Sequence, residues 1–162
     1  MKKWLIMIGC IVLTSGFYIW FTTSTNNPFN IVYFYKEKWG IHLPQPDELQ
    51  EIVASPSSFN GDGEWFYILQ YKETKLNVED TGMVALTAEN VEEASKKIAH
   101  FVTTTTSMVS TSEEVKNAFK AHPIEVKIGD YYFYKEKNDG YDYFIALLKK
   151  DEQQIYLLEW HQ

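Results

Sequence analysis

The chain contains no arginine, and all 15 of its basic residues are lysines. Arginine supplies the planar fork of donors that grips phosphate groups and reads base edges. The 22 acidic residues outnumber the lysines, whereas proteins that bind nucleic acids gain most of their affinity by neutralising phosphates. The composition therefore predicts no nucleic-acid partner. Its acidity suits a basic protein or peptide, or a cation-rich cell wall.

Cysteine is almost absent as well, since Cys10 is the only one and lies near the N-terminus. The chain beyond it has no disulfide, no thiol nucleophile and no thiolate metal ligand. The four histidines are not spaced as His-x-x-x-His, His-Glu-x-x-His or His-x-His, so no local metal signature is present. Motifs of a serine hydrolase or a phosphate-binding loop are also missing. We therefore expect neither a metal nor another cofactor.

The only long apolar run stands at the N-terminus. Trp4–Phe21 contains no charged side chain, follows two lysines, and has aromatic residues near both ends. A membrane-spanning helix needs about 20 mostly apolar residues, and positive flanks stay inside. We therefore predict a single-pass transmembrane signal anchor over residues 1–22, a polar linker over 23–28, and one extracytoplasmic domain over 29–162, held at the cell membrane.

Two other fates of the N-terminal segment stay open. Small residues at Thr22, Thr23 and Ser24 suit cleavage of a signal peptide and secretion, although the A-x-A pattern is missing. Met7-Ile8-Gly9-Cys10 has the shape of a lipobox, so that acylation of Cys10 would anchor a lipoprotein. Two of the 15 lysines precede the apolar run, so the part that follows carries 22 acidic residues against 13 lysines, a formal charge near −9.

Two segments have the stripes and end signals of α-helices. Thr87–Val102 carries one apolar stripe, a capping residue at its start and acidic residues in its first turns. The β-branched run Thr103–Thr106 is expected to stop this helix. Ser112–Ala121 is predicted as a second helix, with a capping box formed by Thr111 and Glu114.

Five segments have the alternation of strands, and a sixth is ambiguous. Ile31–Trp39 fits either a strand or a helix ended by Gly40. Asn138-Asp139-Gly140 is typical of a hairpin turn between two of the strands. The expected strands are Leu49–Ala54, Glu64–Lys72, Tyr131–Lys137, Tyr141–Lys149 and Gln154–His161. Strands and helices without regular alternation indicate an α+β domain. We predict one antiparallel sheet with two main helices packed on one face.

Aromatic residues make up 16% of the chain and gather in the predicted strands. Aromatic side chains are enriched among the residues that dominate binding energy at protein interfaces. The interpretation that follows is a membrane-tethered, non-enzymatic binding domain whose partner is an unknown protein or peptide. One version is a protective or immunity-type protein whose acidity suits a cationic toxin. The candidate anchors of such a binding face are Trp65, Tyr67, Tyr132, Tyr134 and Trp160.

Two rival functions remain. A cell-wall hydrolase would use paired carboxylates, and Asp62 and Glu64 flank Gly63 in a suitable spacing. Glu159 and His161 alternate onto one strand face and form a weaker second pair. A turn at Asp62 and a strand start at Glu64 explain these residues without any chemistry. The third possibility is a small accessory subunit of a membrane complex, in which the anchor itself would matter.

Two short motifs carry a resemblance to known proteins. Gly40-Ile41-His42-Leu43-Pro44 precedes a predicted strand, and Phe59-Asn60-Gly61-Asp62-Gly63-Glu64 leads into an aromatic one. In both respects the chain resembles small membrane-anchored exported proteins of low-GC Gram-positive bacteria. The resemblance covers about residues 30 to 72. It implies the host class and an exported location, and it implies no particular activity.

Overall fold

The computed structural model describes residues 28–55, 62–74, 76–108 and 111–162. Within these residues the chain forms an α+β domain with one antiparallel sheet of six strands and three α-helices. The helices are α2 (Pro28–Trp39), α3 (Val91–Ser107) and α4 (Glu113–Ala121). The strands are β1 (Glu48–Ala54), β2 (Gly63–Gln70), β3 (Val84–Ala85), β4 (Tyr131–Lys137), β5 (Asp142–Lys149) and β6 (Gln154–His161). Two 3₁₀ turns, η1 (Val78–Asp80) and η2 (Asn138–Gly140), connect strands.

None of the helices in the described ranges is long and apolar enough to cross a membrane. The predicted anchor over residues 1–22 and most of the predicted linker over 23–28 lie outside those ranges, as does Cys10. The anchor and its two alternatives therefore stay predictions. The described chain begins with α2, at the last residue of the predicted linker.

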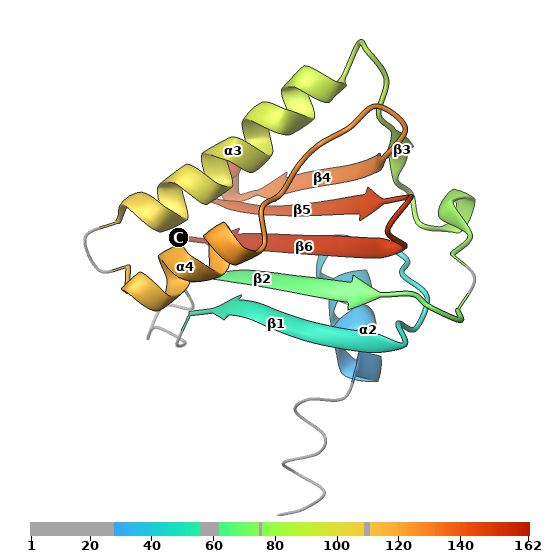
Figure 1. Cartoon of the computed structure of the whole chain (residues 1–162), viewed down its shortest axis with the longest axis horizontal. Coiled ribbons are helices and arrows are strands. Elements are labelled where there is room, and N and C mark those ends of the chain that lie inside the picture. Colours follow the sequence, from blue (N-terminus) through green and yellow to red (C-terminus); the bar gives the residue numbers. More distant parts are fainter. Residues whose placement is uncertain (1–27, 56–61, 75, 109–110) are drawn as a thin grey trace, which may run out of the picture.

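The strand order is β1-β2-β6-β5-β4-β3, and every neighbouring pair is antiparallel (Figure 1). Strands β4, β5 and β6 pair in chain order as an antiparallel meander, and the predicted turn at Asn138–Gly140 connects the first two of them. Asn138, Asp139 and Gly140 all have positive φ angles, which explains the choice of these residue types. β2 lies between β1 and β6, and it buries residues along most of its length.

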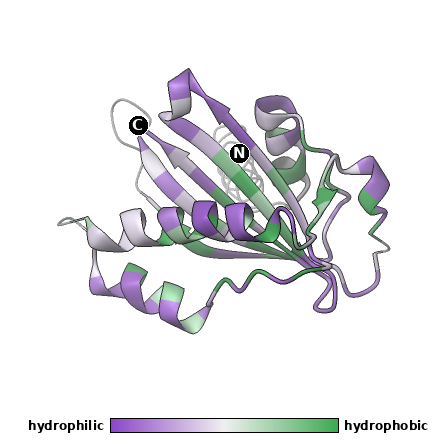
Figure 2. Cartoon of the chain, turned by 90° about the horizontal axis from the view of Figure 1, so that it is seen from above, coloured by the Kyte–Doolittle hydropathy of each residue, from purple (hydrophilic) through white to green (hydrophobic). Residues whose placement is uncertain are grey.

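Helices cover both faces of the sheet. α3 and α4 lie together on one face, which confirms the prediction of two helices packed on one side (Figure 1). α2 lies on the opposite face, and the view from above shows the sheet between the two helical layers (Figure 2). The ambiguous segment before Gly40 is therefore a helix. It forms a second layer that the sequence analysis did not predict.

The two central strands explain why both layers are present. All eight residues of β5 are buried, and so are Ile155–Trp160 of β6. Alternate residues of a strand point to opposite faces, so strands buried along their length need cover on both sides. The α2 face holds Phe144, Ala146 and Leu157, and the α3/α4 face holds a separate apolar cluster.

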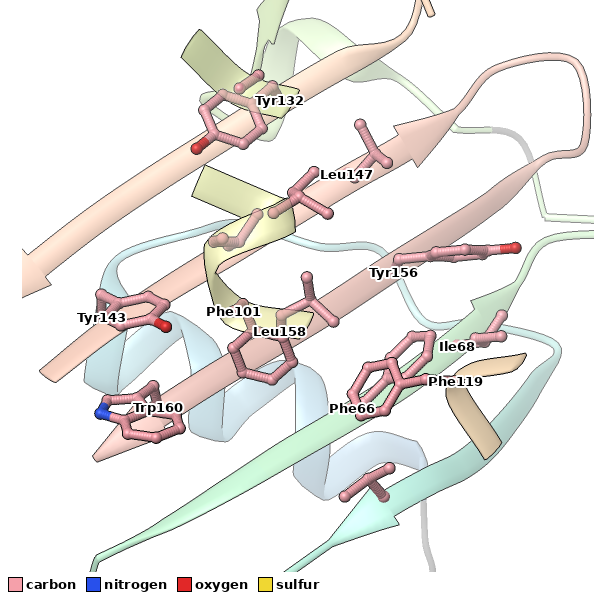
Figure 3. Close-up of a cluster of buried hydrophobic side chains, with 14 of the residues drawn as sticks. Phe66, Ile68, Phe101, Phe119, Tyr132, Tyr143, Leu147, Tyr156, Leu158 and Trp160 are labelled. Carbon is pink, nitrogen blue, oxygen red and sulfur yellow. The ribbon is translucent and has the colours of Figure 1, made fainter. Parts of the chain in front are cut away.

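Phe66 belongs to the cluster beneath α3 and α4 and lies beside Phe119 (Figure 3). Its ring stacks on that of Phe119 from α4, with centroids 5.5 Å apart. Phe101 from α3 meets Phe119 edge-on, with centroids 6.1 Å apart. The three rings connect both helices to β2, so this face of the sheet depends on aromatic packing.

Helix α3 is shifted relative to the prediction, and both predicted ends are wrong. At its start, the side chain of Asn90 accepts a hydrogen bond from the Thr87 N–H at 2.7 Å, which forms a turn ahead of the helix. At its end, the helix continues through the threonine run to Ser107. Thr105 extends the buried stripe, and the Thr106 hydroxyl donates to the Val102 carbonyl at 2.6 Å. A hydroxyl satisfied in this way is compatible with a helix interior.

Helix α4 forms as predicted but uses a different cap. The side chain of Ser112 accepts a hydrogen bond from the Val115 N–H, so Ser112 and not Thr111 is the N-cap. Thr111 instead donates its hydroxyl proton to the Thr105 carbonyl at 2.6 Å, which satisfies the end of α3. The predicted capping box of Thr111 with Glu114 is therefore wrong by one residue. Strand β3 was not predicted, because two residues are too few to show a pattern.

Replacing Phe66 by alanine tests the aromatic centre. Phe66→Ala should lower the free energy of unfolding by about 3–5 kcal/mol, because it leaves a cavity between β2 and both helices. Chemical denaturation of the full-length protein in detergent, followed by tryptophan fluorescence, measures the loss. The control is Tyr141→Ala, at an aromatic residue that is 61% exposed, where a change within about 0.5 kcal/mol is expected. Equal losses in both variants would contradict this account of the core.

Candidate functional site

A cleft of about 510 Å³ lies at the end of the sheet where β1 and β6 finish and β2 begins. Polar side chains from four segments line it, together with Trp160. The last turn of α3 contributes Thr105, and the start of α4 contributes Ser112. We call this cavity the acidic cleft and define it by Ser55, Asp62, Glu64, Thr105, Trp160 and His161.

The start of β2 fits into this edge because Gly63 has no side chain. A Cβ at this position would lie 2.9 Å from the ring of Trp65 and 3.0 Å from the Cβ of Ser55. The first of these contacts is shorter than real Cβ atoms show and the second is tighter than most, so a side chain here would force β1 or the Trp65 ring to shift. In the β2–β6 register Gly63 lies opposite His161, and Glu64 lies opposite Trp160.

The acidic cleft contains the two carboxylates that the sequence analysis singled out. Asp62 and Glu64 both line it, and both are half-buried. The Ser55 hydroxyl donates a hydrogen bond to Oε2 of Glu64. The structure therefore brings the predicted pair to one cavity, with a hydroxyl group beside it.

Thr105 adds an unusual polar group to the cleft. The residue is 2% exposed, and its hydroxyl has no hydrogen-bond partner among the described residues. A buried hydroxyl without a partner is destabilising by about 1–3 kcal/mol. Because Thr105 lines the cleft, rotation of its side chain would offer this hydroxyl to a bound group.

Behind the cleft lies a buried ionic network, which we call the α2 clasp: Lys38, Trp39, Asp142, Glu159 and His161. Oε1 of Glu159 lies 2.6 Å from Nε1 of Trp39, 3.0 Å from Nζ of Lys38 and 3.0 Å from Nε2 of His161. The other ring nitrogen of His161 is 3.1 Å from Oδ1 of Asp142. The clasp therefore joins the end of α2 to β5 and β6.

The partners of Glu159 keep it ionised despite its burial. Burial by itself would raise the pKa of this carboxyl. Hydrogen bonds from His161 and Trp39, together with the charge of Lys38, outweigh burial and hold the pKa below its usual value. Burial, and then the negative charge of Glu159, raise the pKa of the neighbouring Tyr35 hydroxyl. Glu159 is thus a fixed negative charge between β6 and α2.

His161 belongs to both the clasp and the cleft, but it is not placed to act as a base in the cleft. A general base must have a lone pair within hydrogen-bond reach of the proton it removes. Nε2 of His161 lies 2.7 Å from Nζ of Lys38, and Nδ1 faces Asp142. Both nitrogens are engaged inside the network, so His161 offers Ser55 no free imidazole nitrogen.

The structure does bring the second predicted pair, Glu159 and His161, together. The pair lies between β6 and α2, with the side chains of His161 and Glu159 13% and 3% exposed. Among the described residues, no group of three or more His, Cys, Asp or Glu side chains is arranged to hold a metal ion. The pair therefore serves as part of an ion network that positions α2.

The five predicted aromatic anchors do not form one surface. Trp65 lies opposite Glu159 in the β2–β6 register and so shares the α2 face with Tyr67. Tyr132, Tyr134 and Trp160 belong to the α3/α4 face. Trp160 is only 5% exposed and Tyr132 only 8%, so both are core residues. The register between strands, which the sequence does not display, decides this separation.

Tyr134, one of the five predicted anchors, contacts a lysine of α3. Its half-buried ring lies beneath Nζ of Lys97, which is 3.6 Å from the ring centroid. Lys97 also pairs with Glu93 at 3.7 Å on the same helix. The ring face of Tyr134 is therefore already occupied by a side chain of α3.

Sequence reasoning missed Lys38, Trp39, Asp142, Ser55 and Thr105. Lys38, Trp39 and Asp142 join the α2 clasp through partners on other strands or helices. Ser55 meets Glu64 across the β1–β2 pair, and Thr105 reaches the cleft through the packing of α3, so no local motif marks these residues. Comparison of the chain with protein-family models, curated proteins and solved structures gives no match. The function is therefore argued from the cleft, the clasp and the charge.

The lowered pKa of Glu159 gives a pH-dependent prediction. A carboxyl whose pKa is lower in the folded state stabilises the fold above its unfolded pKa of about 4.3, and the contribution is lost as pH falls through the folded value. Glu159→Gln should therefore lower the free energy of unfolding by about 2–4 kcal/mol at pH 7. The gap between wild type and variant should narrow below about pH 4.

Denaturation curves at a series of pH values measure this gap. The matched control is Glu93→Gln, because the Glu93 side chain is 73% exposed and surface ion pairs contribute about 0–1 kcal/mol. A gap for Glu159→Gln that stays constant from pH 7 to pH 3 would show that the charge of Glu159 does not stabilise the clasp.

Proposed function

We propose that the protein is a membrane-tethered, extracytoplasmic binding domain without enzymatic activity, whose acidic cleft takes a basic side chain of a partner protein or peptide. The observation that carries this proposal is the placement of Asp62 and Glu64 in one cavity of 510 Å³. A lysine or arginine entering it would form charge-assisted hydrogen bonds, which are stronger than neutral ones. After rotation of its side chain, the Thr105 hydroxyl would be a further acceptor in the same cavity.

The charge of the rest of the domain supports the same kind of partner. Residues 28–162 carry all 22 acidic residues and 13 of the 15 lysines. A net negative domain attracts a basic partner over distances of about one Debye length, near 10 Å at 0.1 M salt. The net negative charge of the domain and the carboxylates of the cleft therefore both favour positively charged ligands.

The proposed placement suggests a protective role. A single-pass anchor would hold the domain outside the cell, within reach of any cationic toxin or peptide that approaches the membrane. Tethering raises the effective concentration of a binder at the place where it is needed. An immunity-type protein fits this combination of size, charge and location.

Crosslinking in cells tests the proposal. The tagged full-length protein should capture a basic exported protein or peptide, identified by mass spectrometry. The double variant Asp62→Asn/Glu64→Gln should bind that partner at least about tenfold more weakly, which corresponds to about 1.4 kcal/mol. The control Glu89→Gln/Asp151→Asn removes the same charge at two exposed positions outside the cleft, and should bind nearly as well as wild type.

Salt dependence provides the second measurement on the captured pair. Affinity should fall as salt rises, because screening weakens attraction between exposed charges. Equal affinity at low and high salt, or equal binding by the cleft and control variants, would contradict an electrostatic role for the cleft.

The same cavity supports one rival, a cell-wall hydrolase. Most glycoside hydrolases use two carboxylates that flank the bond to be cleaved. In this cleft the hydrogen bond from Ser55 fixes the carboxylate of Glu64. If this function holds, purified wall should release soluble sugar fragments, and Glu64→Gln should abolish the release while Glu89→Gln leaves it intact. Absence of turnover with the folded wild-type protein would remove this rival.

A further inference from the structure

Helix α2 presents two large aromatic side chains to solvent. Tyr33 is 65% exposed and Phe34 is 47% exposed, and they are neighbours in the chain. The opposite side of the helix is fixed in the core, because Tyr35 and Trp39 are 1% and 0% exposed. The exposure of Tyr33 and Phe34 is therefore set by the docking of α2 and not by looseness of the helix.

The polarity of the exposed face changes along α2. Its aromatic residues Tyr33 and Phe34 lie closer to the helix start, and the exposed Lys36 and Glu37 follow them. Near the helix end, Lys135 and Lys137 reach from β4 and donate hydrogen bonds to carbonyls of the last turn. The exposed side of α2 thus combines an aromatic half with a lysine-rich half, in a domain that is acidic elsewhere.

The position of α2, shortly after the apolar run, limits how far its exposed face can lie from the predicted membrane anchor. The apolar run ends at Phe21, and α2 begins at Pro28. Six intervening residues span at most about 20 Å when fully extended. If the apolar run crosses the bilayer, α2 has to lie close to the membrane surface. Tyrosine is enriched at that surface because its ring is apolar and its hydroxyl is polar.

We propose that Tyr33 and Phe34 insert into the interfacial layer of the membrane that the anchor crosses, so that α2 lies against the lipid. This proposal rests on the tethering that forms part of the proposed function. The tether supplies the proximity, and the lysines around the end of α2 reduce repulsion between this side of the domain and anionic head groups.

The contact would orient the whole domain. α2 covers one face of the sheet, and α3 and α4 cover the other (Figure 2). The α2 clasp fixes the end of α2 to β5 and β6, so the helix cannot tilt independently of the sheet. With α2 on the lipid, the α3/α4 face points away from the membrane, toward an approaching partner.

Photo-crosslinking to lipid tests the contact in the full chain. Benzoylphenylalanine is introduced in place of Phe34, and the protein is reconstituted into vesicles of phosphatidylethanolamine and phosphatidylglycerol. The matched control places it instead of Ile128, which is 65% exposed and lies in the turn before β4. Irradiation should give lipid adducts at position 34 and several-fold fewer at position 128.

The outcomes separate this proposal from the tethering. Protein that sediments with the vesicles but forms no more lipid adducts at 34 than at 128 would overturn the contact and leave the tether intact. Crosslinks from position 34 to a second copy of the chain would overturn it in favour of a dimer. Protein that does not sediment with the vesicles would overturn both the tether and the contact.

Discussion

The buried carboxylate of Glu159 is the constraint on which the arrangement of the domain depends. It lies in the central strand β6 and is 2% exposed. An unpaired charge at such a place is strongly destabilising, so β6 can be buried only if cations and donors come with it. Lys38 and Trp39, about 120 residues earlier, supply them. The polar requirement of one strand thereby fixes the position of a helix that is distant in the sequence but adjacent in the fold.

Burial of the central strands on both faces decides where a ligand can enter. Helices cover both sides of β5 and β6, so neither face of the sheet is open to a partner there. The ends of the strands remain, where β2 begins beside the ends of β1 and β6. Gly63 lets these segments pack closely, and its two neighbours in the chain, Asp62 and Glu64, line the cleft. The acidic cleft is therefore a consequence of how the sheet is covered.

Much of the fold can be read from local patterns, and the candidate site only in part. The hairpin at Asn138–Gly140 and the helix ended by His122 have signals within a few residues. The separation of Trp65 from Trp160 does not, because it depends on the β2–β6 register. Glu159 gave a usable hint: a lone acid inside the apolar run Ile155–Trp160 indicates a buried partner, although nothing local indicates Lys38.

The acidic cleft and helix α2 are joined by the side chain of His161. His161 lines the cleft, and its ring contacts Glu159, which in turn holds Lys38 and Trp39 of α2. Apolar packing alone is non-directional and would allow α2 to slide over the sheet. Hydrogen bonds to one buried carboxylate have fixed lengths and directions, so they prevent that movement. The charges of the cleft are consequently held in a fixed geometry relative to α2, and a ligand would meet them already positioned, without the entropic cost of ordering them.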